Sequence, residues 1–132
     1  MSLDAIGIVS HNIKSTIKFY DLLGVSLKEL GGANHYEGTT QSGVRIMVDS
    51  IDLIKQLNSQ WIKPQGSSQI ILCFKQSSPQ SVNELYFKIT SAGYTSIKEP
   101  WNSFWGQRYC IVEDPDGNQI DIFAALATKT NN

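Results

Sequence analysis

The same order of structural elements can be read twice along this chain. Each half begins with a short apolar run, continues with an amphipathic helical pattern and ends with three strand-like segments. In both halves a glycine, Gly24 or Gly93, follows the helical pattern, and glycine enters the left-handed conformation after a helix without steric penalty. The segments that follow these glycines, 25–29 and 94–99, also read alike, as VSLKE and YTSIKE. The repeat predicts two β-α-β-β-β modules.

Helix-start residues and apolar runs set the expected boundaries. Asn12 can cap the first helix, and Ser78 with Pro79 predicts the start of the second, because the hydroxyl accepts an orphan N–H and proline has none to lose. The strands expected in the first module cover residues 3–9, 25–30, 34–40 and 44–49. Those expected in the second module cover residues 69–74, 94–99, 107–113 and 119–124.

The length of 132 residues suits one hydrophobic core better than two independent domains. The segment 59–68 contains proline, glycine and paired serines, as a connector should. We therefore expect one α+β domain over residues 1–132, made of a module at 1–58, the connector 59–68 and a module at 69–132.

A second constraint is the sequence Asp114-Pro115-Asp116-Gly117-Asn118, which lies between two strand-like runs and predicts the turn of a β-hairpin. An aromatic loop broken by proline and glycine, 99–106, leads into this hairpin. Together with the repeated modules, this motif resembles the glyoxalase/bleomycin-resistance/dioxygenase superfamily, also called vicinal oxygen chelate proteins. The resemblance covers essentially the whole chain. It implies two curled mixed sheets around a cleft, commonly completed across a homodimer.

The resemblance also says where the enzymes of the superfamily hold a metal ion, on inward-facing His and Glu side chains of the strands. Ala5 stands where the first strand would carry a histidine, and Gln69 stands at the corresponding position of the second module. Only Asp121 falls where the last acidic ligand is expected. An alanine cannot coordinate a metal, so the chain is more similar to the metal-free, bleomycin-resistance-like branch, and no cofactor is expected.

Two alternatives remain open. His35 and Glu37 are two residues apart and face the same side of a strand, so with Asp121 they could bind a divalent metal in a lyase, isomerase or dioxygenase. A pair of polar residues on a solvent face is the plainer interpretation of His35 and Glu37. The other alternative is a structural or regulatory dimer with a vestigial cleft.

Large aromatic residues in the polar loop indicate a ligand site. Trp101, Phe104 and Trp105 gain little there unless they pack on a ligand, a partner subunit or the edge of the core. The polar residues that could orient a ligand are Arg45, Gln69 and Asp121. Arg108 is expected to pair with Asp114 or Asp121 in a structural role.

Composition excludes several other functions. The net charge of -1 offers no basic field for nucleic acid or anionic lipid, and no apolar run approaches the roughly 20 residues that span a bilayer. Residues 1–4 lack a secretory signal, which predicts a cytoplasmic protein.

Cys73 and Cys110 lie in apolar runs and are expected to be buried, reduced thiols. No phosphate loop, nucleophile elbow or catalytic residue is recognised. We expect a small-molecule-binding protein that sequesters an aromatic or drug-like ligand without making or breaking bonds.

Overall fold

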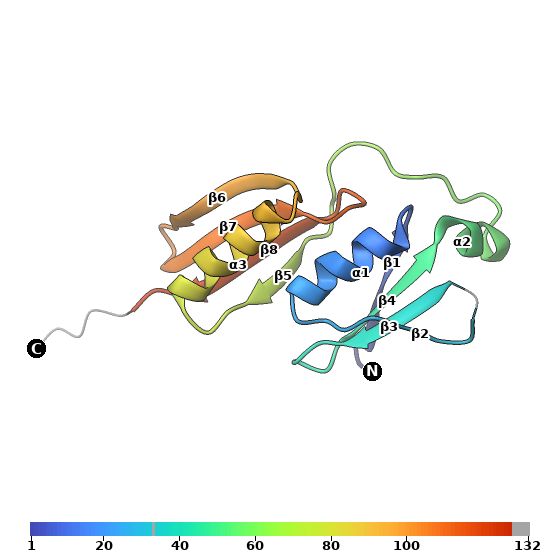
Figure 1. Ribbon diagram of the computed structural model, residues 1–132, viewed down its shortest axis with the longest axis horizontal. Helices are drawn as coiled ribbons and strands as arrows, with labels where there is room; N and C mark the ends of the chain where they lie inside the picture. Colours follow the sequence, from blue (N-terminus) through green and yellow to red (C-terminus); the bar gives the residue numbers. More distant parts are fainter. Residues whose placement is uncertain (33, 128–132) are drawn as a thin grey trace, which may run out of the picture. The chain divides into compact units, whose positions relative to one another are not determined.

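The computed structural model describes residues 1–32 and 34–127 (Figure 1). The chain divides into two compact units, residues 1–67 and 68–132. Each unit contains one four-stranded mixed sheet, and the predicted β-α-β-β-β order is present in both. The expected α+β class with paired modules is therefore confirmed.

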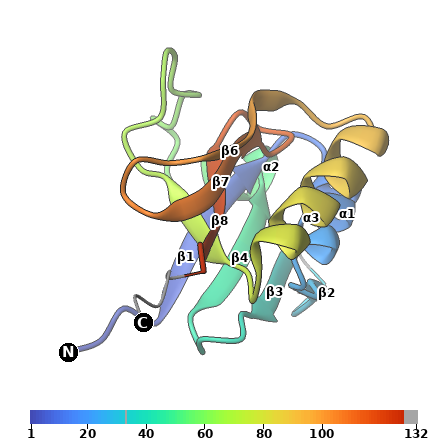
Figure 2. The same ribbon diagram turned by 90° about the vertical axis from the view of Figure 1, so that its left-hand side faces the viewer.

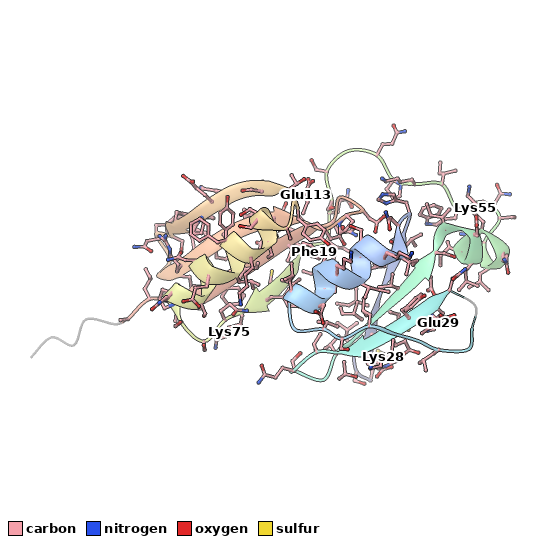
Figure 3. All side chains as sticks on the ribbon, in the orientation of Figure 1. Phe19, Lys28, Glu29, Lys55, Lys75 and Glu113 are labelled. Carbon is pink, nitrogen blue, oxygen red and sulfur yellow. The ribbon has the colours of Figure 1, made fainter. Side chains whose placement is uncertain are left out.

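Unit 1 contains four strands and two helices: β1 (Ala5–Ser10), α1 (Ile13–Leu22), β2 (Lys28–Glu29), β3 (His35–Thr39), β4 (Arg45–Ser50) and α2 (Ile51–Leu57). The strand order is β1-β4-β3-β2, with β1 parallel to β4 and the other pairs antiparallel. Helix α1 covers one face of this sheet, where Ser10 on β1 meets Thr16 on α1 through a 2.8 Å hydroxyl contact. Phe19, labelled on α1 in Figure 3, is completely buried.

Unit 2 repeats this topology with four strands and one helix: β5 (Leu72–Lys75), α3 (Pro79–Ser91), β6 (Ser96–Asn102), β7 (Gln107–Glu113) and β8 (Gln119–Ala125). The order is β5-β8-β7-β6, with β5 parallel to β8. Helix α3 packs against β6, β7 and β8 and covers one face of the sheet (Figure 2). The opposite face, which α3 leaves uncovered, is called the open face below.

The helix boundaries follow from the predicted caps. The Asn12 side chain accepts a hydrogen bond from the N–H of Ser15, and the Ser78 hydroxyl accepts one from the N–H of Ser81. Gly24 and Gly93 have φ values of 82° and 93°, which lie in the left-handed region expected after each helix. Local sequence thus determines where both long helices begin and end.

The core of unit 2 follows from strict alternation along the strands. On β8, Ile120 and Ile122 are completely buried, and they pair with the equally buried Val112 and Cys110 of β7. These side chains lie on the same face as Arg108, which reaches Asn83 on α3. Even-numbered residues of β7 and β8 therefore face the helix, and odd-numbered ones lie on the open face.

Several expected boundaries are wrong. β2 covers only Lys28–Glu29, β5 begins at Leu72 and not at 69, and β6 extends to Asn102, so Trp101 lies in a strand and not in a loop. β6 tolerates Pro100 because it is an edge strand with register shifts. Cross-strand pairing, which the local sequence does not encode, sets these limits.

Two further features differ from the sequence prediction. The helix α2 was not predicted, because it is only seven residues long and begins directly after a strand, at the cap Ser50. Cys73 was expected to be buried but is exposed, whereas Cys110 is buried as expected. The reason is that Cys73 lies on the open face of an edge strand.

Candidate ligand-binding site

The open face of unit 2 carries a cluster of aromatic rings from three neighbouring strands and one loop. Trp101 on β6 pairs with Tyr109 on β7, which in turn pairs with Phe123 on β8. Residues in register on adjacent strands point to the same side of a sheet, so these three rings form a row. Trp105, in the loop between β6 and β7, adds a fourth ring. These four residues are called the aromatic wall.

The rings of the aromatic wall touch one another in ordered geometries. The Tyr109 ring centroid lies 5.3 Å from those of Trp101 and Trp105, both edge to face. On its other side Tyr109 stacks on Phe123, with centroids 5.9 Å apart and planes inclined by 22°. Such arrangements are the favourable ones for aromatic quadrupoles. The wall is thus a pre-formed surface centred on Tyr109.

The loop that carries Trp105 is held by its own hydrogen bonds. The Ser103 hydroxyl donates to the carbonyl of Gln107 at 2.9 Å and accepts from the N–H of Gln107 at 3.0 Å. The Trp105 indole donates to Gln107 Oε1 at 2.7 Å. Gly106, with φ of 90°, makes the turn that this closure requires. These hydrogen bonds fix the orientation of the Trp105 side chain, although 49% of its surface is exposed.

Phe104 extends the cluster outwards. Its ring lies 5.0 Å from that of Trp105, but the residue is 98% exposed. A phenylalanine left in water forgoes the free energy that burial would release. Phe104 is therefore positioned for contact with something outside unit 2.

A buried carboxylate lies beside the aromatic wall. Asp121, only 6% exposed, accepts a short hydrogen bond from the Tyr109 hydroxyl and another, at 3.0 Å, from Gln119 Nε2. Cys73 on β5 pairs with Asp121 and faces the same side. The open face thus combines flat apolar rings with one fixed negative charge.

The neighbours of Asp121 are weak acids that stay protonated at neutral pH. Burial, and then the Asp121 charge, raises the pKa of the Cys73 thiol. Burial, and then its hydrogen bond to Asp121, raises the pKa of the Tyr109 hydroxyl. Since a thiol attacks only as its thiolate, Cys73 is a poor nucleophile here.

The structure brings together four of the six predicted ligand-binding residues. Trp101, Phe104, Trp105 and Asp121 all belong to the cluster on the open face of unit 2. Gln69 is exposed and lies in a bend before β5, outside the sheet. The prediction missed Tyr109, Phe123 and Gln119, although the alternation in 107–113 and 119–124 places them on the same side as Asp121.

The partners expected for Arg108 are wrong. Its guanidinium donates to the side-chain oxygens of Asn83 at 3.0 Å and Asn102 at 3.1 Å, on the helix side of the sheet. Asp114 instead organises the hairpin turn, where its carboxylate accepts from the N–H groups of Asp116 and Asn118, both at 2.9 Å. The reason is the alternation of side chains along a strand, which directs Arg108 to the opposite face of the sheet from Asp121.

Arg45, the sixth predicted residue, belongs to unit 1 and lies in a chain of charged groups. Its guanidinium contacts Asp4 at 2.7 Å and also Glu37, whose carboxylate lies 3.0 Å from His35 Nε2. The other ring nitrogen of His35 contacts Asp49. His35 and Glu37 do face the same side, as predicted, but Arg45 is occupied by two carboxylates.

The metal alternative named His35 and Glu37 together with Asp121. The first two belong to unit 1 and Asp121 to unit 2. Within residues 1–32 and 34–127, no three His, Cys, Asp or Glu side chains are grouped so that they could hold a metal ion. Both ring nitrogens of His35 already contact carboxylates, so neither nitrogen is directed at an open position.

Comparison with known proteins identifies the family. Residues 2–122 match the Glyoxalase/Bleomycin resistance protein/Dioxygenase superfamily, and the chain belongs to it. No curated protein matches the sequence. None of the helices in the described residues has the length and apolar character needed to cross a membrane.

Solved structures share the fold at low sequence identity. A glyoxalase/bleomycin resistance protein/dioxygenase family enzyme from Burkholderia phytofirmans PsJN superposes with a TM-score of 0.84 at 20% identity, covering 96% of this chain and 100% of its own. A hypothetical protein from S. aureus gives 0.78 at 15% identity, with coverages of 94% and 93%. A lactoylglutathione lyase from Agrobacterium tumefaciens gives 0.68 at 13%, with coverages of 93% and 92%. Identities this low establish a common fold and nothing more specific.

Proposed function

We propose that this chain is a metal-free small-molecule-binding protein of the bleomycin-resistance type, acting in the cytoplasm by sequestering a flat aromatic or drug-like ligand. The observation that carries the proposal is the aromatic wall of Trp101, Trp105, Tyr109 and Phe123 on the open face of unit 2. These rings are only partly buried, although large aromatic side chains gain most when fully covered. A planar ligand stacked on them would complete that burial.

Binding without reaction is the simplest use of the groups beside the wall. The polar groups are the carboxylate of Asp121, the hydroxyl of Tyr109 and the thiol of Cys73, the last two protonated at neutral pH. They can orient a ligand through hydrogen bonds, and a site with mostly apolar lining and a few fixed polar groups is typical of small-molecule binding. We assign no residue a catalytic role.

The test is equilibrium binding of flat aromatic compounds, followed by quenching of tryptophan fluorescence. Stacking on one aromatic ring contributes about 1–3 kcal/mol, so Trp105→Ala should weaken binding by about tenfold or more. Because Trp105 is 49% exposed, its loss should leave the melting temperature nearly unchanged. Trp61, in the connector, offers a matched control: Trp61→Ala should leave affinity unchanged. A collapse of the melting temperature in Trp105→Ala, with no ligand found for the unmutated protein, would show that the rings are structural.

A further inference from the structure

The charge of the aromatic wall's surroundings points to the class of ligand, an inference that rests on the proposed function. The residues in register on the open face include Asp121 and, nearer the edges of the sheet, Lys75, Lys98 and Glu113. Figure 3 labels Lys75 and Glu113, which lie at the ends of antiparallel strands β5 and β7. These two carboxylates and two ammonium groups cancel in formal charge, so the burial of each group determines which sign dominates beside the rings.

Burial favours Asp121. Its residue exposure is 6%, whereas Lys75 and Lys98 are exposed. Water and salt screen exposed charges strongly and buried charges weakly, so the carboxylate dominates the potential next to the rings. The pKa values of the neighbouring thiols are consistent with a strong negative potential. Burial, and then the Asp121 charge, raises the pKa of Cys73, and the same two causes raise the pKa of Cys110 to about 12.

The wall already holds a cation. The ammonium of Lys98 lies 3.9 Å from the centroid of the Trp101 ring, within the range of a cation–π contact. The Tyr109 ring can also make a cation–π contact. Its hydroxyl donates a hydrogen bond to the Asp121 carboxylate, which increases the electron density of the ring. The faces of Trp101 and Tyr109 are thus surfaces on which positive charge is stabilised.

The cations of this cluster, Lys75 and Lys98, are both exposed, and the Lys98 ammonium already lies on the Trp101 ring. Neither arginine adds a free guanidinium to it. Arg108 points to the helix side, where Asn83 and Asn102 accept its hydrogen bonds. The Arg45 guanidinium is already paired with the carboxylates of Asp4 and Glu37. A ligand carboxylate stacked on the wall would instead approach the charge of Asp121, which is unfavourable.

We propose that the ligand of the aromatic wall is an aromatic cation, a planar ring system that carries positive charge on nitrogen. The rings would stack on Trp105 and Tyr109, and the charge would be stabilised by the ring faces and by Asp121. A neutral ring of the same shape keeps the stacking but loses the charge contribution. An anionic ring of the same shape is disfavoured.

The experiment compares three flat probes of nearly equal shape at slightly alkaline pH: N-methylacridinium, acridine and an acridine carboxylate. Affinity is measured by tryptophan quenching and by calorimetry. N-methylacridinium should bind about tenfold tighter than acridine, and the carboxylate should bind more weakly than acridine. Raising the ionic strength should weaken binding of N-methylacridinium and leave that of acridine unchanged.

Two substitutions test which charged residues cause the preference for the cationic probe. Asp121→Asn keeps an oxygen for the Tyr109 hydroxyl but removes the charge, so the preference for N-methylacridinium should fall below about threefold. Lys98→Gln removes the cation that occupies Trp101, so binding of N-methylacridinium should strengthen by about two- to fivefold. Lys88→Gln, on α3, is the control for net charge and should change nothing.

The outcomes separate the two proposals. Equal affinity for the three probes, with binding that is still lost in Trp105→Ala, overturns the cation inference and leaves sequestration standing. Tighter binding of the carboxylate has the same meaning. Failure of all three probes to bind, or binding that survives Trp105→Ala, overturns the sequestration proposal and the cation inference with it.

Discussion

The Tyr109 hydroxyl donates a hydrogen bond to Asp121 Oδ2 across the neighbouring strands β7 and β8. The contact joins the centre of the aromatic wall to the buried carboxylate on the same face of the sheet. Each residue depends on the other, because a buried carboxylate without donors is costly and a tyrosine ring needs a partner for its hydroxyl. The relationship therefore contributes to stability as well as to the candidate site.

Tyr109→Phe should separate these two contributions. The substitution removes the donor and leaves the ring, so the free energy of unfolding should fall by about 1–3 kcal/mol while ring stacking on a ligand is retained. Urea denaturation measures the first quantity and fluorescence quenching the second. Tyr86→Phe is the matched control, because it removes an exposed hydroxyl contact to Ser96 and should cost less than about 0.5 kcal/mol. Equal losses in the two variants would contradict the assignment.

Gly38 is the glycine whose missing side chain the fold of unit 1 requires. A Cβ at this position would lie 2.6 Å from the carbonyl oxygen of Ser26 and 2.9 Å from Cγ1 of Val25. Gly38→Ala should therefore destabilise the protein by about 1–3 kcal/mol through overpacking. Gly7→Ala is the control, since nothing lies within 4 Å of a Cβ built there. Thermal unfolding of both variants is the measurement, and a neutral Gly38→Ala would show that Ser26 can move away.

The two cysteines should differ in reactivity. Cys73 is exposed and Cys110 buried, so an alkylating reagent should modify one thiol in the native protein and two in urea. The raised pKa of Cys73 lowers its thiolate fraction at any given pH. Its alkylation should therefore be slower than that of free cysteine near neutral pH and should accelerate at a higher pH than free cysteine does. Rates measured across alkaline pH test this, and a faster reaction than free cysteine would contradict it.

We expect the purified protein to carry no stoichiometric metal and to gain no glyoxalase or ring-cleavage activity with nickel, zinc, manganese or iron. The superfamily resemblance predicts a metal-binding histidine at the position of Ala5, and His35 contacts carboxylates through both ring nitrogens. Elemental analysis by mass spectrometry gives the direct measurement. A transition metal that is retained on dialysis and lost in His35→Ala or Asp121→Ala, but not in His11→Ala, would favour the metal-dependent alternative.

We also expect a symmetric homodimer. Phe104, which extends outwards beyond the aromatic wall, is 98% exposed, and two-fold association is the commonest symmetric way to cover such an apolar group. Analytical ultracentrifugation should give about twice the chain mass. Phe104→Ser should weaken association, whereas Phe87→Ser, an exposed phenylalanine on α3, serves as the comparison. A monomer throughout the micromolar range would exclude the dimer.

The candidate site was only partly predictable. The positions of Trp101, Phe104 and Trp105 in a proline- and glycine-broken segment indicated rings available to a ligand or a partner, and the superfamily resemblance singled out Asp121 as the last acidic position. The role of Tyr109 was not predicted, because its importance depends on register with Trp101 and Phe123. Gln69 and Arg45 were included on the strength of strand positions, but Gln69 lies in a bend before β5 and Arg45 is paired with Asp4 and Glu37. A shift of one residue reverses the face to which a strand side chain points.

Local sequence by itself determined the element order of each module, the caps at Asn12 and Ser78 and the glycines that end both helices, since these depend on backbone angles and on neighbouring hydrogen bonds. The alternation that buries Ile120 and Ile122 was also encoded locally. Only the tertiary structure decided that Arg108 contacts Asn83, that Arg45 is neutralised by Asp4 and Glu37, and that Tyr109 contacts three aromatic rings as well as Asp121. These contacts join residues from different strands and helices, and strand register, which results from packing of the whole sheet, sets their distances.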